Sequence, residues 1–294
     1  MRIEKAIEHF LSELKGIRNA ADNTISSYGI DLKQFTEFCD ERNIDSVEKI
    51  TQKHIRTFLV QLNSENNSTG TISRKLTSLR NLFNFLLRSG EIEKNPLKEI
   101  KNPKIKRSIP ETLPLDSYLK IINLLDEEKG ESKFQTKAIF ELLYGSAIRV
   151  SELCDLDIGD VNFQSKTLKV HGKGSKERLV PLGEKSIEAI TDYMSTLNDR
   201  TFRNPLFFSP RGERIYPRLV QRLVKKYIQK VSDVSKKSPH ILRHSAATHM
   251  LDRGADLLGV KEILGHENLK TTQIYTHVSV ERLKKTHKSS HPKS

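Results

Sequence analysis

The most informative stretch of the sequence is residues 238–251, SPHILRHSAATHML. His240 and Arg243 are three positions apart, so on a helix their side chains lie on the same face. An imidazole beside a guanidinium is suited to bind an oxyanion such as a phosphate. A helix cap next to a surface arginine is the alternative interpretation of this pair alone.

A metal site is another interpretation of the same stretch, because His240 and His244 have i, i+4 spacing and His249 follows them. The stretch lacks the glutamate of the HExxH zinc motif, and Arg243 between the two histidines would repel a dication. The sequence also offers no cluster of carboxylates for magnesium. We therefore expect neither a metal ion nor a cofactor.

A candidate nucleophile lies in residues 264–277, LGHENLKTTQIYTH. The phenol of Tyr275 can attack a phosphodiester where no metal-activated water is present. Its ordinary pKa of about 10 means that it needs positively charged neighbours to react at neutral pH. His266 begins the same connection after Gly265. A packed aromatic side chain is the alternative interpretation of Tyr275.

Residues 142–153, LLYGSAIRVSEL, supply a second arginine. Small residues precede Arg149, so a phosphate can approach it closely. Glu152 follows three positions later and can hold the guanidinium in place. The alternative is a plain salt bridge within a helix, which contributes only about 0.2–0.5 kcal/mol.

Residues 171–178, HGKGSKER, place Lys173 between two glycines at the tip of an expected hairpin. A lysine on such a turn can enter a site and protonate a leaving alkoxide. A solvated turn lysine is the alternative. The nucleotide-binding pattern GxxxxGK[ST] occurs nowhere in the sequence, which argues against nucleotide hydrolysis.

In their order and spacing these motifs resemble the tyrosine recombinases of the λ-integrase family, in particular the Xer recombinases. The resemblance covers essentially the whole chain and implies Tyr275 as the nucleophile and Glu152 as an acidic support residue. The other catalytic residues it implies are Arg149, Lys173, His240, Arg243 and His266.

The resemblance implies a metal-free transesterification that cuts and rejoins DNA. Two arginines and a histidine stabilise the phosphorane, tyrosine forms a 3′-phosphotyrosine bond, and lysine or histidine protonates the leaving 5′ oxygen. By resemblance the protein acts as a tetramer at inverted-repeat, dif-like sites to resolve chromosome dimers before cell division. A second recombinase and a DNA translocase such as FtsK are further candidate partners. A mobile-element integrase, a type IB topoisomerase and a non-catalytic DNA-binding regulator are the alternatives.

The composition agrees with a nucleic-acid partner. The chain has 294 residues, enough for two domains, and a formal net charge of +13. Residues 1–107 contribute +5 and residues 108–294 contribute +8, so both parts can contact DNA. Cys39 and Cys154 cannot form a disulfide framework, and no apolar run approaches the ~20 residues of a membrane span. We expect a cytoplasmic protein.

The apolar spacing predicts a mainly α protein. Residues 1–95 are expected to form a four-helix bundle, with helices over 3–15 and from about 23, 51 and 71, the last ending at Gly90 and burying Leu86 and Leu87. The resemblance implies that this bundle is the SAM-like core-binding domain of the family. We expect the outer face of the fourth helix to bind DNA through Ser73, Arg74, Lys75, Thr77 and Arg80.

Four prolines between Asn95 and Pro114, together with the run KNPKIKR, predict an extended linker over residues 96–112. It is either merely solvated or a strap along the DNA backbone, with Lys104, Lys106 and Arg107 as candidate contacts. Residues 113–294 are expected to form a mostly α catalytic domain with a small antiparallel sheet of strands 161–163, 167–170 and 178–182, and residues 269–275 are among its expected helices. By resemblance its tail, residues 280–290, docks on a neighbouring protomer.

Overall fold

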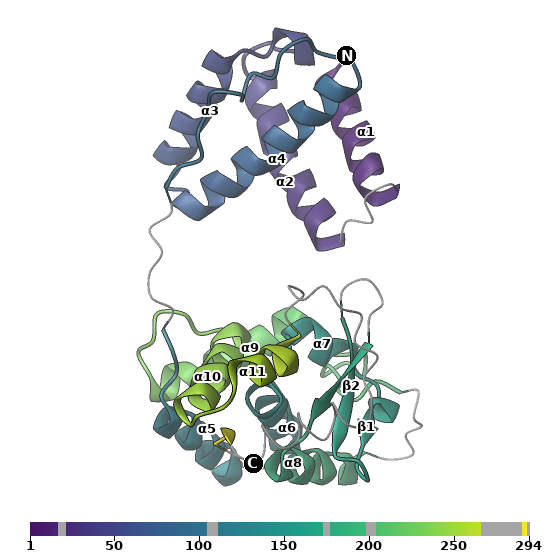
Figure 1. Cartoon of the computed structure of the whole chain (residues 1–294), viewed down its shortest axis with the longest axis vertical. Helices are drawn as coiled ribbons and strands as arrows, with labels where there is room; N and C mark the ends of the chain where they lie inside the picture. Colours follow the sequence, from purple (N-terminus) through teal and green to yellow (C-terminus); the bar gives the residue numbers. More distant parts are fainter. Residues whose placement is uncertain (17–21, 105–110, 173–176, 198–203, 266–289, 293–294) are drawn as a thin grey trace. The chain divides into compact units, whose positions relative to one another are not determined.

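The computed structural model describes residues 1–16, 22–104, 111–172, 177–197, 204–265 and 290–292. The chain divides into two compact units, Met1–Ser108 and Ile109–Ser294 (Figure 1). Each unit has its own hydrophobic core. None of the helices in the described part of the chain is long and apolar enough to cross a membrane.

In its described residues, the first unit is the predicted bundle of four helices, with a short 3₁₀ turn between the second and third. Its helices are α1 (Ile3–Gly16), α2 (Asp22–Asp40), α3 (Gln52–Ser64) and α4 (Thr69–Arg88). Thr51 and Ser68 cap α3 and α4 by accepting hydrogen bonds from backbone amides of the first turn. The fourth helix therefore begins two residues earlier than the sequence pattern predicts.

Aromatic side chains fill the core of this unit. The Phe35 ring lies edge-on to that of Phe58, with centroids 5.1 Å apart, and both rings are buried. Leu87, which the apolar spacing of α4 assigned to the core, is 42% exposed. That expectation was wrong because Leu87 lies in the last turn of the helix, next to the buried Leu86 but on a different face.

The segment after α4 packs on the same bundle. Leu97 and Ile100 are buried in its core, although the sequence places them in the linker. The Arg80 guanidinium donates hydrogen bonds to the carbonyl oxygen of Ile100, at 2.7 Å, and to Oδ1 of Asn102, at 2.8 Å. Leu97, Ile100 and Asn102, at the start of the predicted linker, therefore belong to the helical unit.

The second unit is mostly helical, with one three-stranded antiparallel sheet in the order β1-β2-β3. Its strands are β1 (Val161–Asn162), β2 (Thr167–His171) and β3 (Glu177–Pro181). Its helices are α5 (Leu115–Glu127), α6 (Ser132–Gly145), α7 (Val150–Asp155), α8 (Glu184–Ser195), α9 (Pro217–Val231), α10 (Pro239–Asp252) and α11 (Leu257–Leu264). The predicted mainly α fold with a small sheet is confirmed.

Helix α6 is the central element of this unit, because it is buried on nearly every side. The Tyr144 ring stacks on Tyr118 of α5 with centroids 3.9 Å apart, which ties α5 to α6. The chain leaves α6 after Gly145 and reaches Arg149, the residue that precedes α7. A rigid, buried helix therefore fixes the point at which the first candidate arginine emerges.

Candidate active site

Arg149 and Glu152 form the pair predicted from their spacing, in a more enclosed setting than a surface salt bridge. The backbone amide of Arg149 donates to Glu152 Oε2 at 2.7 Å, and Arg149 Nη1 donates to Oε1 at 2.8 Å. The Glu152 side chain is 3% exposed, whereas that of Arg149 is 38% exposed. The carboxylate is thus part of the core, and the guanidinium above it is open to a ligand.

The end of α11 joins Arg149 and Arg243. Arg243 Nη1 donates to the carbonyl oxygen of Ala147 at 2.7 Å, and its Nη2 donates to that of Leu264. Arg149 Nη2 donates to the carbonyl oxygen of Gly265 at 3.3 Å. Carbonyls at a helix C-terminus lack helical partners and carry partial negative charge, so they favour cations. The last turn of α11 is therefore an anchor for both arginines.

A third arginine, which the motif analysis missed, contacts the same carboxylate. Arg178 of β3 donates from Nη1 to Glu152 Oε1 at 2.6 Å and from Nη2 to Oε2 at 2.9 Å. Only 8% of its side chain is exposed. A signal for it exists in the sequence, because Arg178 and Val180 share one face of β3, and that face is buried. A charged residue at a core position of a strand needs a buried partner.

Burial and the charges of neighbouring arginines shift the pKa values within this cluster. Burial alone raises the pKa of the Glu152 carboxyl, but hydrogen bonds and charge from Arg178, and then from Arg149, bring the pKa below its ordinary value. Burial lowers the pKa of Arg243 to about 10, and the neighbouring charge of Arg149 acts in the same direction. Three guanidiniums around one ionised carboxylate leave an excess of two positive charges. Such a cluster is built to receive a dianionic or developing anionic oxygen centre.

Two of the three histidines of α10 are exposed, and the third contacts a tyrosine of α6. His240 is exposed in the first turn, one turn before Arg243, as its spacing predicts. His244 is also exposed, while His249 Nδ1 is 2.8 Å from the hydroxyl of Tyr144. Within the described ranges no three His, Cys, Asp or Glu side chains are grouped so as to hold a metal ion.

The remaining predicted residues of the site lie outside the described residues. These are Lys173, His266 and Tyr275, together with the predicted helix 269–275. Gly265, the residue before His266, ends α11 with a left-handed backbone, φ +63°. Its carbonyl contact with Arg149 means that the chain leaves α11 directly beside the arginine cluster.

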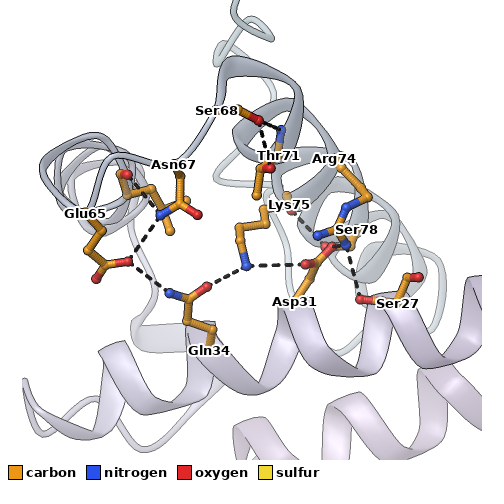
Figure 2. A network of polar contacts seen from close by, with 11 residues as sticks. Ser27, Asp31, Gln34, Glu65, Asn67, Ser68, Thr71, Arg74, Lys75 and Ser78 are labelled. Carbon is orange, nitrogen blue, oxygen red and sulfur yellow. Dashed lines mark hydrogen bonds and ion pairs between the residues drawn. The ribbon is translucent and has the colours of Figure 1, made fainter. Parts of the chain in front are cut away.

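Helix α4 presents fewer exposed cations than the sequence indicated. Lys75 is 6% exposed, and its ammonium donates to Gln34 and to Asp31 (Figure 2). The expectation that Lys75 lies on the outer face was wrong, because the buried carboxylate of Asp31 requires a cationic partner. Arg74 also bonds to Asp31 but has 44% of its side chain exposed.

The polar side chains of α4 near Arg80 contact the segment that follows the bundle. Asn102 donates to Ser73 Oγ at 3.3 Å and to Thr77 Oγ1 at 3.4 Å. Lys104 is exposed just beyond, and Lys106 and Arg107 lie outside the described residues. Among the described candidates of this unit, Arg74 and Lys104 are therefore the exposed cations.

A basic hollow on the second unit was not predicted from the sequence. It lies between the polar face of α9 and the start of α10, and is lined by Tyr216, Gln221, Ser238 and the cations Arg218, Arg222, Lys225 and Lys237. The signal was present, since positions 218, 222 and 225 recur at helical spacing. Ser238 precedes α10, so the hollow reaches the end of the helix whose first turn carries His240.

Comparison with known protein families identifies the class. The Phage integrase family matches residues 111–282, and the Phage integrase, N-terminal SAM-like domain, matches residues 7–90. The chain belongs to the phage integrase family of tyrosine recombinases, enzymes that cleave and rejoin DNA through a transient phosphotyrosine intermediate.

Within that family the chain is similar to Xer-type site-specific recombinases. It is 40% identical to Tyrosine recombinase XerC of Natranaerobius thermophilus, over 97% of this chain and 98% of the relative. It is 37% identical to Tyrosine recombinase XerC of Chlorobaculum parvum, over 97% of this chain and 94% of the relative.

Solved structures share the fold. The Tn1549 transposon integrase in complex with circular intermediate DNA has a TM-score of 0.70 at 18% identity, covering 96% of this chain and 98% of that one. A λ integrase dimer bound to a COC′ core site has a TM-score of 0.68 at 20% identity, covering 94% and 100%. At these identities the likeness extends to the fold alone.

Proposed function

We propose that Arg149, Arg243 and His240 bind the scissile phosphate and that Tyr275 attacks it. The observation that carries this assignment is the excess of two positive charges around Glu152. One guanidinium, that of Arg149, is open to solvent above the buried carboxylate. Charge that develops on the phosphorane is offset there by preorganised donors, in a site partly shielded from water.

In the proposed step the bond from Tyr275 Oη to phosphorus forms while the bond from phosphorus to O5′ breaks. The phenol releases its proton, and the leaving O5′ takes a proton from Lys173 or His266. The products are a 3′-phosphotyrosine and a free 5′ hydroxyl. Because the phosphodiester energy is kept in the new bond, a 5′ hydroxyl from another strand can reverse the step without ATP.

The DNA backbone is proposed to cross the basic hollow of the second unit and the exposed cations of the first. Arg218, Arg222 and Lys225 on α9 support the first contact, because the hollow that they line includes Ser238, two residues before His240. Arg74 and Lys104 support the second, because their side chains are exposed. Cations of this kind position a duplex without reading its sequence.

The cellular role we propose is resolution of chromosome dimers in the cytoplasm, at a dif-like inverted repeat. The similarity to XerC proteins over nearly the whole chain supports this role over that of a mobile-element integrase. A second recombinase and a translocase such as FtsK are proposed partners. Assembly into a tetramer through residues 280–289, which lie outside the described residues, is proposed as well from the resemblance to the family.

The end of the tail differs from the expected contact with a neighbouring protomer. Ser290 and His291 are buried within their own chain. His291 Nε2 lies 3.1 Å from the carbonyl oxygen of Tyr144, at the end of α6. Docking in trans is therefore proposed only for the residues before Ser290.

A nicked suicide duplex tests the catalytic assignment. Wild-type protein should form an SDS-resistant adduct with it, in the presence or absence of a chelator. Tyr275→Phe should bind the same duplex and form no adduct, because only the nucleophilic oxygen is lost. An adduct from the Phe variant would overturn the assignment of Tyr275, and the absence of any adduct from wild type would favour a non-catalytic regulator.

A further inference from the structure

Arg178 is a buried cation that the proposed chemistry does not use. It comes from β3, a strand whose buried face otherwise packs into the core, and it reaches Glu152 rather than solvent. Its two Nη atoms engage both carboxylate oxygens, at 2.6 and 2.9 Å. Its Nε is buried and has no acceptor among the described residues. An apolar side chain would fill this position without leaving a buried donor unsatisfied.

We propose that Arg178 is a positioning residue that holds the Glu152 carboxylate and offsets its charge, so that Arg149 keeps its positive charge for the phosphate. This inference rests on the proposed role of Arg149. Arg178 itself does not touch DNA, because its side chain is almost completely covered.

The geometry of Glu152 supports a shared charge. Oε1 accepts from Arg178 at 2.6 Å and from Arg149 Nη1 at 2.8 Å. Oε2 accepts from Arg178 at 2.9 Å and from the Arg149 backbone amide at 2.7 Å. Every strong acceptor direction of the carboxylate is therefore used, and Arg149 and Arg178 divide one negative charge between them.

Loss of Arg178 would redistribute that charge. Arg149 would become the main guanidinium partner of Glu152, and the pair would approach neutrality. Glu152 Oε2 also forms a long ion pair with Arg243 Nη1, at 3.9 Å, and a small rotation would shorten this ion pair to a hydrogen bond. Both arginines assigned to the phosphate would then be drawn toward a carboxylate instead.

Arg178 also lies close to Gly265, the residue whose carbonyl accepts a hydrogen bond from Arg149. A Cβ atom at position 265 would lie 2.8 Å from Arg178 Nε and 3.0 Å from its Cδ and Cζ. The Gly265 carbonyl is also the acceptor for Arg149 Nη2. The flat guanidinium of Arg178 therefore supports the backbone that orients Arg149.

The test measures adduct formation on nicked suicide DNA with Arg178→Met, Arg178→Lys and the double variant Arg178→Met/Glu152→Gln. The Met variant should form the adduct about 10²-fold more slowly, comparable to the loss of one preorganised donor, with site binding nearly unchanged. The Lys variant should be faster than the Met variant. The double variant should form the adduct about tenfold faster than the Met variant, because the neutral amide that replaces the Glu152 carboxylate no longer competes with the phosphate for Arg149.

Rescue by Glu152→Gln separates a role in charge from a role in folding. Removing a second hydrogen-bonding group from a merely structural pair would add to the damage rather than reverse it. If the double variant is as slow as the Met variant or slower, the proposal is wrong. Should the Met variant melt below the assay temperature, Arg178→Gln replaces it. Equal rates for the Gln and Lys variants would also refute a role for the charge.

Arg214→Met is the matched control. Arg214 lies in the same unit and bonds to the carboxylate of Asp157 and to the backbone carbonyls of Cys154 and Leu156, and none of these contacts is with the Glu152 carboxylate. The Arg214→Met substitution should lower the melting temperature and leave the rate of adduct formation by the folded enzyme unchanged. Arg149→Ala is measured in parallel. Normal cleavage by Arg149→Ala would refute the proposed function, whereas slow cleavage by Arg149→Ala with normal cleavage by Arg178→Met would refute only the role of Arg178.

Discussion

Substitution of Gly265 by alanine should disable the active site by a steric clash with Arg178, although it removes no catalytic group. Gly265 has φ +63°, a conformation that costs an L-residue about 1–2 kcal/mol. Its new Cβ would also lie 2.8 Å from Arg178 Nε, so the side chain or the backbone must move by several tenths of an ångström. Overpacking of this kind costs about 1–3 kcal/mol. We therefore expect a total loss of about 2–5 kcal/mol in the free energy of unfolding.

The same displacement should slow cleavage in the molecules that remain folded. Movement of Gly265 lengthens its bond with Arg149 Nη2, which is already 3.3 Å, and movement of Arg178 releases Glu152. A shift of ~1 Å in a catalytic group can cost about 10²-fold in rate. Chemical denaturation measures the stability, and single-turnover adduct formation on nicked DNA measures the rate.

Gly254→Ala isolates the contribution of backbone strain. Gly254 lies in the same unit with φ +82°, and a Cβ there would meet no atom within 4 Å. It should lose about 1–2 kcal/mol of stability and cleave at the wild-type rate when folded. If Gly265→Ala loses no more stability than Gly254→Ala and cleaves as fast, the contact between Gly265 and Arg178 has no functional consequence.

Other outcomes follow from the same contacts. Arg243→Ala should slow adduct formation by about 10²–10³-fold with little effect on site binding, and near-normal cleavage would make Arg243 structural. Lys75→Met should lower the free energy of unfolding by about 1–3 kcal/mol, since Asp31 loses a buried partner. Arg74→Ala should instead mainly weaken DNA binding. Denaturation measures the stability of each variant and filter binding measures its affinity for DNA, and the reverse pattern would contradict the assignment. Binding should fall steeply with salt, and the paired substitution of Arg222 and Lys225 by alanine should reduce the slope of log K against log salt by about 0.9 for each lost phosphate contact. An unchanged slope would place the DNA away from the basic hollow.

The helices were largely predictable because their signals are local. Apolar spacing, the caps Thr51 and Ser68, and the stop at Gly90 all act within one or two turns, and the structure has helices at these places. The exceptions lie at the ends. Leu87 is exposed in a last turn, and Leu97 and Ile100 join a core that the pattern of prolines did not reveal. Whether an apolar residue is covered depends on what packs beside it, and the local sequence does not contain that information.

Arg178 and Lys75 illustrate the same limit for charged residues. Lys75 was predicted to lie on an exposed helix face, and Arg178 was given no role. Both side chains are buried, and each bonds to a carboxylate: Arg178 to Glu152 and Lys75 to Asp31. Their partners are 26 and 44 positions away in the chain. Pairing over such distances is decided by how elements pack, although the inward position of Arg178 on β3 was a signal that strand alternation could have supplied.

The sequence by itself determined the class of protein, because the motifs around Arg149, His240 and Arg243 carry chemistry that few arrangements of residues provide. It also determined the helices and the small sheet, since their periodicity is local. Only the tertiary structure decided how the charges are shared: which arginine is open to a phosphate, which is buried, and which carboxylate and helix end hold them. Electrostatic energy depends on distance and burial, and both are properties of the packed chain rather than of its order of residues.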